Sequence, residues 1–211
     1  IGLPALGTTF VSCFGYIAFA RMVSGMGTTI FAAHSIAITA EQIVYIPGYG
    51  LRVATSTLVG NALGEKDIRK LKATERVSIL ITLLIMVVNG IGLYLFAYPF
   101  MRLFTNSVNA ARIGSEMLRL VSFSEPFFGL MIVLEGISYG MGRTKHVFAC
   151  EAVSMWGIRI FGTFLCVNVF GLGLKAVWLC MIADNICKAI LLYIFRPKHV
   201  EENADDRGAL R

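Results

Sequence analysis

The chain has 211 residues, of which 56% are hydrophobic and only 15% are charged. A soluble domain usually carries about 25% charged residues, so this composition excludes the ordinary soluble class and indicates a polytopic membrane protein. The formal net charge is +6, but the basic residues fall in loops between apolar runs, which is typical of topology signals and not of nucleic-acid binding.

The apolar runs are long enough to predict an all-α bundle of six transmembrane helices over residues 1–196. In chain order, the expected spans cover roughly residues 3–23, 32–64, 77–100, 118–139, 147–170 and 175–195. Residues 197–211 are a polar tail with too little apolar content to pack. No charged leader and cleavage site precede the first run, so a signal peptide is not predicted and an upstream part is expected to be missing.

The basic residues of the loops alternate between the two sides of this bundle. One side would hold Lys66, Arg69, Lys70, Lys72, Arg76, Arg143, Lys145, Arg196 and Lys198, and the other only Arg102, Arg112 and Lys175. Positive residues accumulate in cytoplasmic loops. We therefore expect a multi-pass protein of the plasma membrane with both ends of the chain in the cytoplasm.

The second span carries charge where a passive anchor would have none. His34, Glu41 and Arg52 lie within it, and Pro47-Gly48 is expected to break it. At 100° per residue, these charged residues and Tyr45 share one stripe of an ideal helix. Charged groups at membrane depth usually face a bundle interior or a water-filled cavity.

Two interpretations of this stripe stay open. In the first, Glu41 is a cation or proton site near mid-membrane, because low dielectric favours the neutral form of a carboxylic acid and lets it exchange protons. Tyr45 would then offer a hydrogen bond or an aromatic face to a cationic substrate. In the second, Glu41 pairs with Arg52 or His34 and only locks helices together. His34 alone is expected to cap the helix or hydrogen-bond.

Glu125-Pro126 in the fourth span is the second candidate. Pro126 would kink the helix by losing its bond to Ser122, and a carboxylate beside freed carbonyls suits a cation or proton. The alternative is a helix-entry charge near the membrane interface. Pro47, Gly48 and Pro126 are the expected hinges.

Other intramembrane charges are expected to be structural, with Asp184 and Lys188 neutralising each other four residues apart. Two GxxxG pairs, Gly60/Gly64 and Gly136/Gly140, are typical of close helix packing. No P-loop, HExxH or GxSxG motif is present, and the three histidines are scattered along the chain. Neither an enzyme nor a metal site is predicted.

The order of motifs resembles the C-terminal half of the MATE family, the multidrug and toxic compound extrusion transporters. The resemblance rests on Ala32-Ala33-His34, on Val59-Gly60-Asn61-Ala62-Leu63-Gly64, on Gly140-Met141-Gly142-Arg143-Thr144 and on Trp156-Gly157-Ile158-Arg159. It implies one lobe of a twelve-helix transporter, with an N-terminal six-helix lobe as its missing partner. It also implies membrane lipid as surroundings and export of cationic or amphipathic compounds or drugs, driven by sodium or proton entry, with no other cofactor.

The sequence departs from the family where some members carry coupling acids. Residues 10–14 contain no acid, Arg143 stands where other members have Asp, and Ala176 replaces a frequent Gly. Coupling would then rest on Glu41 and Glu125 or on the absent lobe, and His34, Tyr45 and Arg52 are expected to line the substrate cavity. The alternatives are a lipid-linked sugar flippase of the same superfamily and, less favoured, an intramembrane enzyme.

Overall fold

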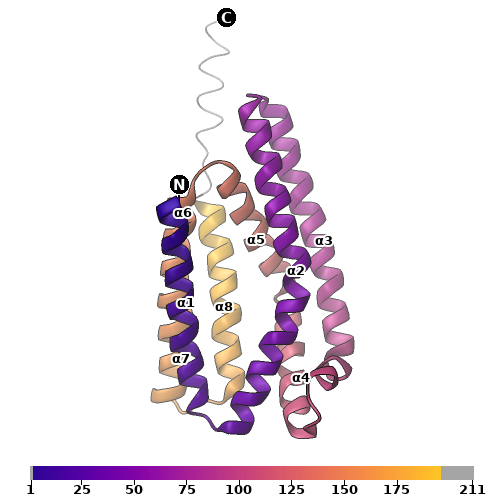
Figure 1. Cartoon of the computed structure of the whole chain (residues 1–211), viewed down its shortest axis with the longest axis vertical. Coiled ribbons are helices and arrows are strands. Elements are labelled where there is room, and N and C mark those ends of the chain that lie inside the picture. The colour runs from indigo at the N-terminus through magenta and orange to yellow at the C-terminus, as the bar shows by residue number, and fades with distance from the viewer. Residues whose placement is uncertain (1, 196–211) are drawn as a thin grey trace, which may run out of the picture.

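The computed structural model describes residues 2–195 (Figure 1), and every regular element in that range is helical, which confirms the all-α prediction. The elements are α1 (Gly2–Ser24), α2 (Thr28–Gly64), α3 (Ile68–Phe104), α4 (Val108–Ser122), α5 (Glu125–Gly140), α6 (Thr144–Ser154), the π-helical η1 (Met155–Ile160), α7 (Phe161–Phe164), the π-helical η2 (Leu165–Val169) and α8 (Leu174–Ile194). Within this described range, five helices are long and apolar enough to cross a membrane, or six if the bent pair α4–α5 counts as one span. The predicted tail at 197–211 lies outside the described residues.

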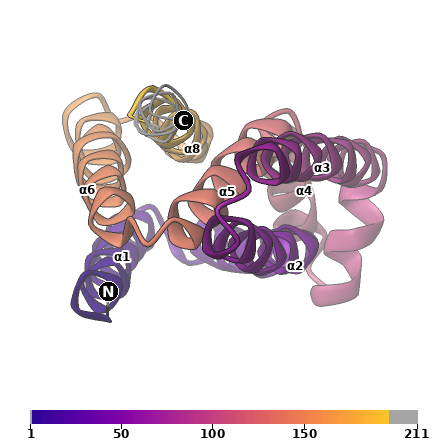
Figure 2. The ribbon, with the colours of Figure 1, turned by 90° about the horizontal axis from the view of Figure 1, so that it is seen from above.

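The helices form two groups that meet along α5 and α8. Viewed from above, α1, α6 and α8 lie on one side and α2, α3, α4 and α5 on the other (Figure 2). Within the second group α2 packs against α3 and α5, while α5 also contacts α8. This arrangement places the face of α2 that carries the predicted charged stripe opposite α8 and α1.

The hairpin of α2 and α3 extends beyond the other helices (Figure 1). Each of the two helices has 37 residues, which is about 55 Å at 1.5 Å per residue, against about 30 Å for the hydrocarbon core. The third span was predicted to begin at residue 77, but α3 already begins at Ile68, where the Asp67 side chain caps it by accepting from the Lys70 N–H. Capping lets the polar turns of the loop continue the helix.

The sequence predicted a break in the helix at Pro47-Gly48, and this prediction is wrong. Helix α2 runs without interruption through Pro47, and Figure 1 shows that it changes direction near its middle. Gly48 is buried, and a Cβ atom at that position would touch Met86 and Phe128 at 3.5 Å. Packing against α3 and α5 therefore keeps the chain helical where the proline removes one backbone bond.

The fourth span is broken, though not as the sequence predicted. Helix α4 ends at Ser122 and α5 begins at Glu125, with a bend of 61° between them. Pro126 lies in the first turn of α5, where its missing N–H has no helical partner to lose. Pro126 therefore starts a new helix and does not kink a continuous one.

The glycine pairs bring α2 and α5 into backbone contact. A Cβ atom at Gly136 would lie 2.7 Å from the carbonyl oxygen of Arg52, and one at Gly140 would lie 2.6 Å from that of Ser56. This confirms the close packing predicted for Gly136/Gly140 and fixes the rotation of α5 relative to α2.

Candidate functional site

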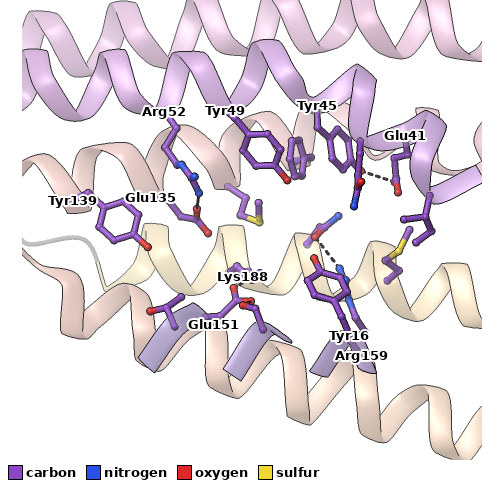
Figure 3. A pocket seen from close by; sticks show the side chains of 18 residues that line it. Tyr16, Glu41, Tyr45, Tyr49, Arg52, Glu135, Tyr139, Glu151, Arg159 and Lys188 are labelled. Atoms are coloured by element: carbon purple, nitrogen blue, oxygen red, sulfur yellow. Dashed lines mark hydrogen bonds and ion pairs between the residues drawn. The ribbon is translucent and has the colours of Figure 1, made fainter. Parts of the chain in front are cut away.

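A polar cavity of about 220 Å³ lies between the two helix groups (Figure 3). Four of the elements around it, α1, α2, α5 and α8, supply most of its wall, and α6 and η1 complete it. The lining residues that matter below are Ser12, Tyr16, Glu41, Tyr45, Tyr49, Arg52, Glu135, Tyr139, Glu151, Arg159, Asn185 and Lys188. A cavity rich in charge and tyrosine inside an apolar bundle is a candidate binding site.

Glu41 is buried, and its carboxylate accepts a hydrogen bond of 2.6 Å from the hydroxyl of Tyr45. The Tyr45 ring stacks on Phe128, with ring centroids 3.7 Å apart. Both residues line the cavity, as predicted, and lie one turn apart on α2. The stacking holds the phenol in the position from which it orients Glu41.

Arg52 also lines the cavity, but its partner is neither Glu41 nor His34. Its Nη1 lies 3.0 Å from Oε2 of Glu135 on α5. The alternative in which Glu41 pairs with Arg52 or His34 is therefore wrong. The Gly136 contact explains the difference, because it places the turn of α5 that carries Glu135 directly against Arg52.

Two further ion pairs close the opposite wall. Lys188 of α8 pairs with Glu151 of α6, and Ser12 of α1 donates to the same carboxylate at 2.7 Å. The predicted Asp184–Lys188 pair is wrong, because Asp184 is turned toward η1. Its Oδ2 lies 2.8 Å from Nε of Arg159.

Arg159 is fixed on every side. Besides Asp184, its guanidinium faces the rings of Tyr16 at 5.6 Å and Phe19 at 5.9 Å, and it donates to the Asn185 amide oxygen at 3.4 Å. Asp184 in turn accepts from the hydroxyl of Ser154. Arg159 lies in the π-helical segment η1, and π-helical turns occur frequently at functional sites.

Among the described residues, Glu41 is the one cavity-lining carboxylate outside an ion pair. Glu135 is neutralised by Arg52 and Glu151 by Lys188, and the third cavity cation, Arg159, is neutralised by Asp184. The cavity therefore presents a single uncompensated acid, held by a tyrosine hydroxyl. Such a group can accept a proton or bind a monovalent cation.

His34 does not line this cavity, which corrects the prediction. It is buried near the other end of α2, and its Nδ1 lies 3.2 Å from Nε1 of Trp178, which donates to it. Its ring also lies 5.5 Å from that of Phe19. Of the two expected structural roles of His34, a helix cap or a hydrogen bond, the structure shows the hydrogen bond.

Glu125 is fully buried outside the cavity lining, at the N-terminus of α5. Neither of its carboxylate oxygens has a hydrogen-bond partner among the described residues, and Gly90 of α3 leaves it room, since a Cβ there would lie 3.1 Å from Cβ of Glu125. A helix N-terminus partly compensates a buried carboxylate. Glu125 is the first residue of α5, as the helix-entry alternative expects, and its position relative to the membrane interface stays a prediction.

Sequence reasoning alone did not assign Glu135, Glu151 and Lys188 to this cavity. The signal for these residues in the sequence is their charge within apolar spans, which marks a functional candidate by default. The sequence does not show which of these charges meet, because that depends on how the helices are rotated. Within residues 2–195, no group of three or more His, Cys, Asp or Glu side chains is placed to hold a metal ion.

These features define a class: a polytopic helical lobe with a half-open polar cavity at its centre, typical of membrane transporters. The sequence profile of the MatE family matches residues 4–165, and the chain belongs to this family. The chain is 30% identical to the probable multidrug resistance protein NorM of Thermotoga maritima over 197 residues, covering 92% of this chain and 42% of that protein. A protein described in the same words from Photorhabdus laumondii is 27% identical, with 92% and 44% covered.

Solved structures share the fold. A structure described as MATE in the straight conformation matches with a TM-score of 0.86 at 20% identity, over 96% of this chain and 45% of that one. The eukaryotic MATE transporter AtDTX14 matches with a TM-score of 0.83 at 21% identity, over 98% and 47%. The chain thus spans less than half the length of the relatives it matches.

Proposed function

We propose that this chain forms the C-terminal lobe of a secondary active antiporter, which exports organic cations in exchange for sodium ions or protons. The observation that carries the proposal is the single uncompensated carboxylate, Glu41, in a cavity otherwise neutralised by ion pairs. Family membership and the NorM relatives support the antiporter class. The second lobe would be a six-helix unit that completes the transport pathway.

Glu41 would alternate between two occupants. In one state it holds a proton or a sodium ion, and in the other it faces an organic cation that the surrounding tyrosines also contact. Because one carboxylate balances one positive charge, the two occupants exclude each other. Entry of the ion then releases the drug, which is the exchange that an antiporter needs.

Glu125 would be a second protonation site. Its carboxyl group has no partner and no exposed surface, so a change in its charge would favour a different packing of α5 against α3. Pro47 and Gly48 in α2, and Pro126 at the start of α5, would be the points about which the helices bend as the lobe alternates.

The test is efflux of a fluorescent organic cation from vesicles under imposed sodium or proton gradients. In the complete protein, Glu41→Gln should reduce ion-driven efflux at least tenfold. The matched control is Glu116→Gln, which removes an acid whose side chain is 45% exposed on α4, and it should leave efflux unchanged. Intact ion-driven efflux in Glu41→Gln would reject the proposal.

The orientation belongs to the same proposal. We propose a plasma-membrane protein in which Lys66 of the α2–α3 loop and Arg69 in the first turn of α3 lie in the cytoplasm. A cysteine placed at Lys66, which is exposed, should react with an impermeant maleimide only after the membrane is opened. Labelling in intact cells would reverse the topology.

A further inference from the structure

Arg52 stands where the cavity meets the surface. A second, outer groove of about 580 Å³ runs between α1 and α2, and it shares Arg52, Tyr16 and Tyr139 with the inner cavity. Its wall is rich in hydroxyl groups, contributed by Thr8 and Ser12, which also line the inner cavity, and by Thr9, Ser56 and Thr57. Figure 3 shows Arg52, Glu135 and Tyr139 at one end of the inner cavity and Glu41 at the other. We call the end of the cavity that holds Arg52, Glu135 and Tyr139 the neck.

The three cavity cations differ in how firmly they are held. Side-chain exposure is 6% for Arg159 and 9% for Lys188, and their acid partners are equally enclosed. Arg52 is 32% exposed while its partner Glu135 is only 8% exposed. An ion pair with one solvated member contributes little to stability, so Arg52 can leave Glu135 far more easily than the other two cations can leave their partners.

The surroundings of the Arg52 guanidinium are those of a bound organic cation. A buried carboxylate lies 3.0 Å away, and the ring of Tyr49 faces its Cζ at 5.3 Å. A planar cation gains from both a carboxylate and an aromatic face. Tyr49 also makes an edge contact with Phe128, with ring centroids 6.1 Å apart, so the aromatic wall is supported from behind.

We propose that Glu135 and Tyr49 form a subsite for a flat organic cation at the neck, and that the Arg52 guanidinium fills it when no guest is bound. An incoming cation enters through the outer groove, displaces Arg52 from Glu135, and then moves along the inner cavity to Glu41. The side chain of Arg52 swings into the outer groove, where hydroxyl groups replace its lost contact. The proposal deepens the proposed function, on which it rests for the source of the guest.

Chemical rescue tests the subsite without any transport measurement. Arg52→Ala empties the site, and N-ethylguanidinium replaces the missing group. In the purified complete protein, the thermal unfolding midpoint of Arg52→Ala should rise by about 2–5 °C, saturably, at about ten times the Kd of this probe. The wild-type protein, whose site is filled, should show no saturable rise, and saturation-transfer NMR should detect the bound probe only in the variant.

Three controls make the result specific. N-ethylurea has the shape without the charge and should have no effect, while ethylammonium has the charge without the plane and should bind at least fivefold more weakly. Arg52→Ala combined with Glu135→Gln removes the carboxylate and should abolish the response. Arg52→Gln, which keeps most of the stem, is measured in parallel in case the alanine variant does not fold.

Equal responses of the wild-type protein and the variant, or a response that survives Glu135→Gln, would overturn the subsite. This outcome is separable from the fate of the proposed function. Failed rescue together with lost efflux in Glu41→Gln removes only the subsite. Successful rescue together with unchanged efflux in Glu41→Gln leaves a cation subsite in a protein that is not driven through Glu41.

Discussion

The indole N–H of Trp178 on α8 donates a hydrogen bond of 3.2 Å to Nδ1 of His34 on α2, and this buried bond links the two helix groups. Both side chains are buried, and their rings meet edge to face with centroids 5.9 Å apart. Trp178→Phe keeps the aromatic packing and removes the donor. It should lower the free energy of unfolding by about 1–3 kcal/mol, because His34 is left with an unpaired buried nitrogen.

Denaturant unfolding followed by circular dichroism measures this loss. The matched control is Trp156→Phe, since Trp156 is 44% exposed on the outer face of η1, and its effect should stay within about 0.5 kcal/mol. Equal losses in the two variants would show that the hydrogen bond does not join the groups.

Breaking the Arg159–Asp184 pair should be costly. Arg159→Met leaves Asp184 charged and enclosed, and we expect a loss of about 3–5 kcal/mol in unfolding free energy. The double variant Arg159→Met/Asp184→Leu should recover most of that loss, since neither charge then remains buried. Lys175→Ala, which breaks the exposed pair with Glu116, should change the unfolding free energy by no more than about 1 kcal/mol.

Glycine at position 136 is expected to be needed for the contact of α5 with α2. Gly136→Ala drives a methyl group against the Arg52 carbonyl and should destabilise the protein by about 1–3 kcal/mol. In Gly92→Ala, where a Cβ meets nothing within 4 Å, helix propensity should instead stabilise it by about 0.5–1 kcal/mol. If the unfolding midpoints of the two variants move in the same direction, the claim that the α2–α5 contact needs glycine at position 136 is contradicted.

Glu125 should show opposite effects on stability and on transport. Replacing this unpartnered buried carboxyl by the amide of Gln removes the cost of burying a charge, so Glu125→Gln should unfold at a higher denaturant concentration. Ion-driven efflux should nevertheless fall at least tenfold, because the amide cannot exchange a proton. If Glu125→Gln raises the stability and leaves efflux unchanged, Glu125 has a structural role and no part in ion coupling.

Much of the fold could be predicted because hydropathy reports burial in lipid directly. The apolar runs located the membrane-length helices to within a few residues, apart from the polar first turns of α3 and the first ten residues of α4, which begins at Val108 and not at residue 118. The break before Glu125 was placed wrongly because Pro126 has the same signature inside a helix, where it kinks, and in a first turn, where it is neutral. Only the packing of α4 and α5 distinguishes these positions.

The contacts of the site that are local in the sequence could be predicted, and those between residues far apart in the chain could not. Glu41 and Tyr45 lie one helical turn apart, so their contact follows from helix geometry alone. Arg52 and Glu135 are 83 residues apart, and their meeting depends on how the glycines of α5 rotate it against α2. The same spacing rule misled the pairing of Lys188, because tertiary contact with Glu151 prevailed over a neighbour on its own helix.

The wide turns of the fifth span have a consequence for comparison with other chains. A π-helical turn holds one residue more than an α-helical turn, so deleting a single residue within 155–160 can be absorbed by reverting to α geometry. The side chains on the two sides of the deletion would then keep the faces that they present now, because the wide turn accommodates the extra residue. A relative without the wide turn would align with this chain through a one-residue gap, on both sides of which positions facing lipid and positions facing the interior keep their roles.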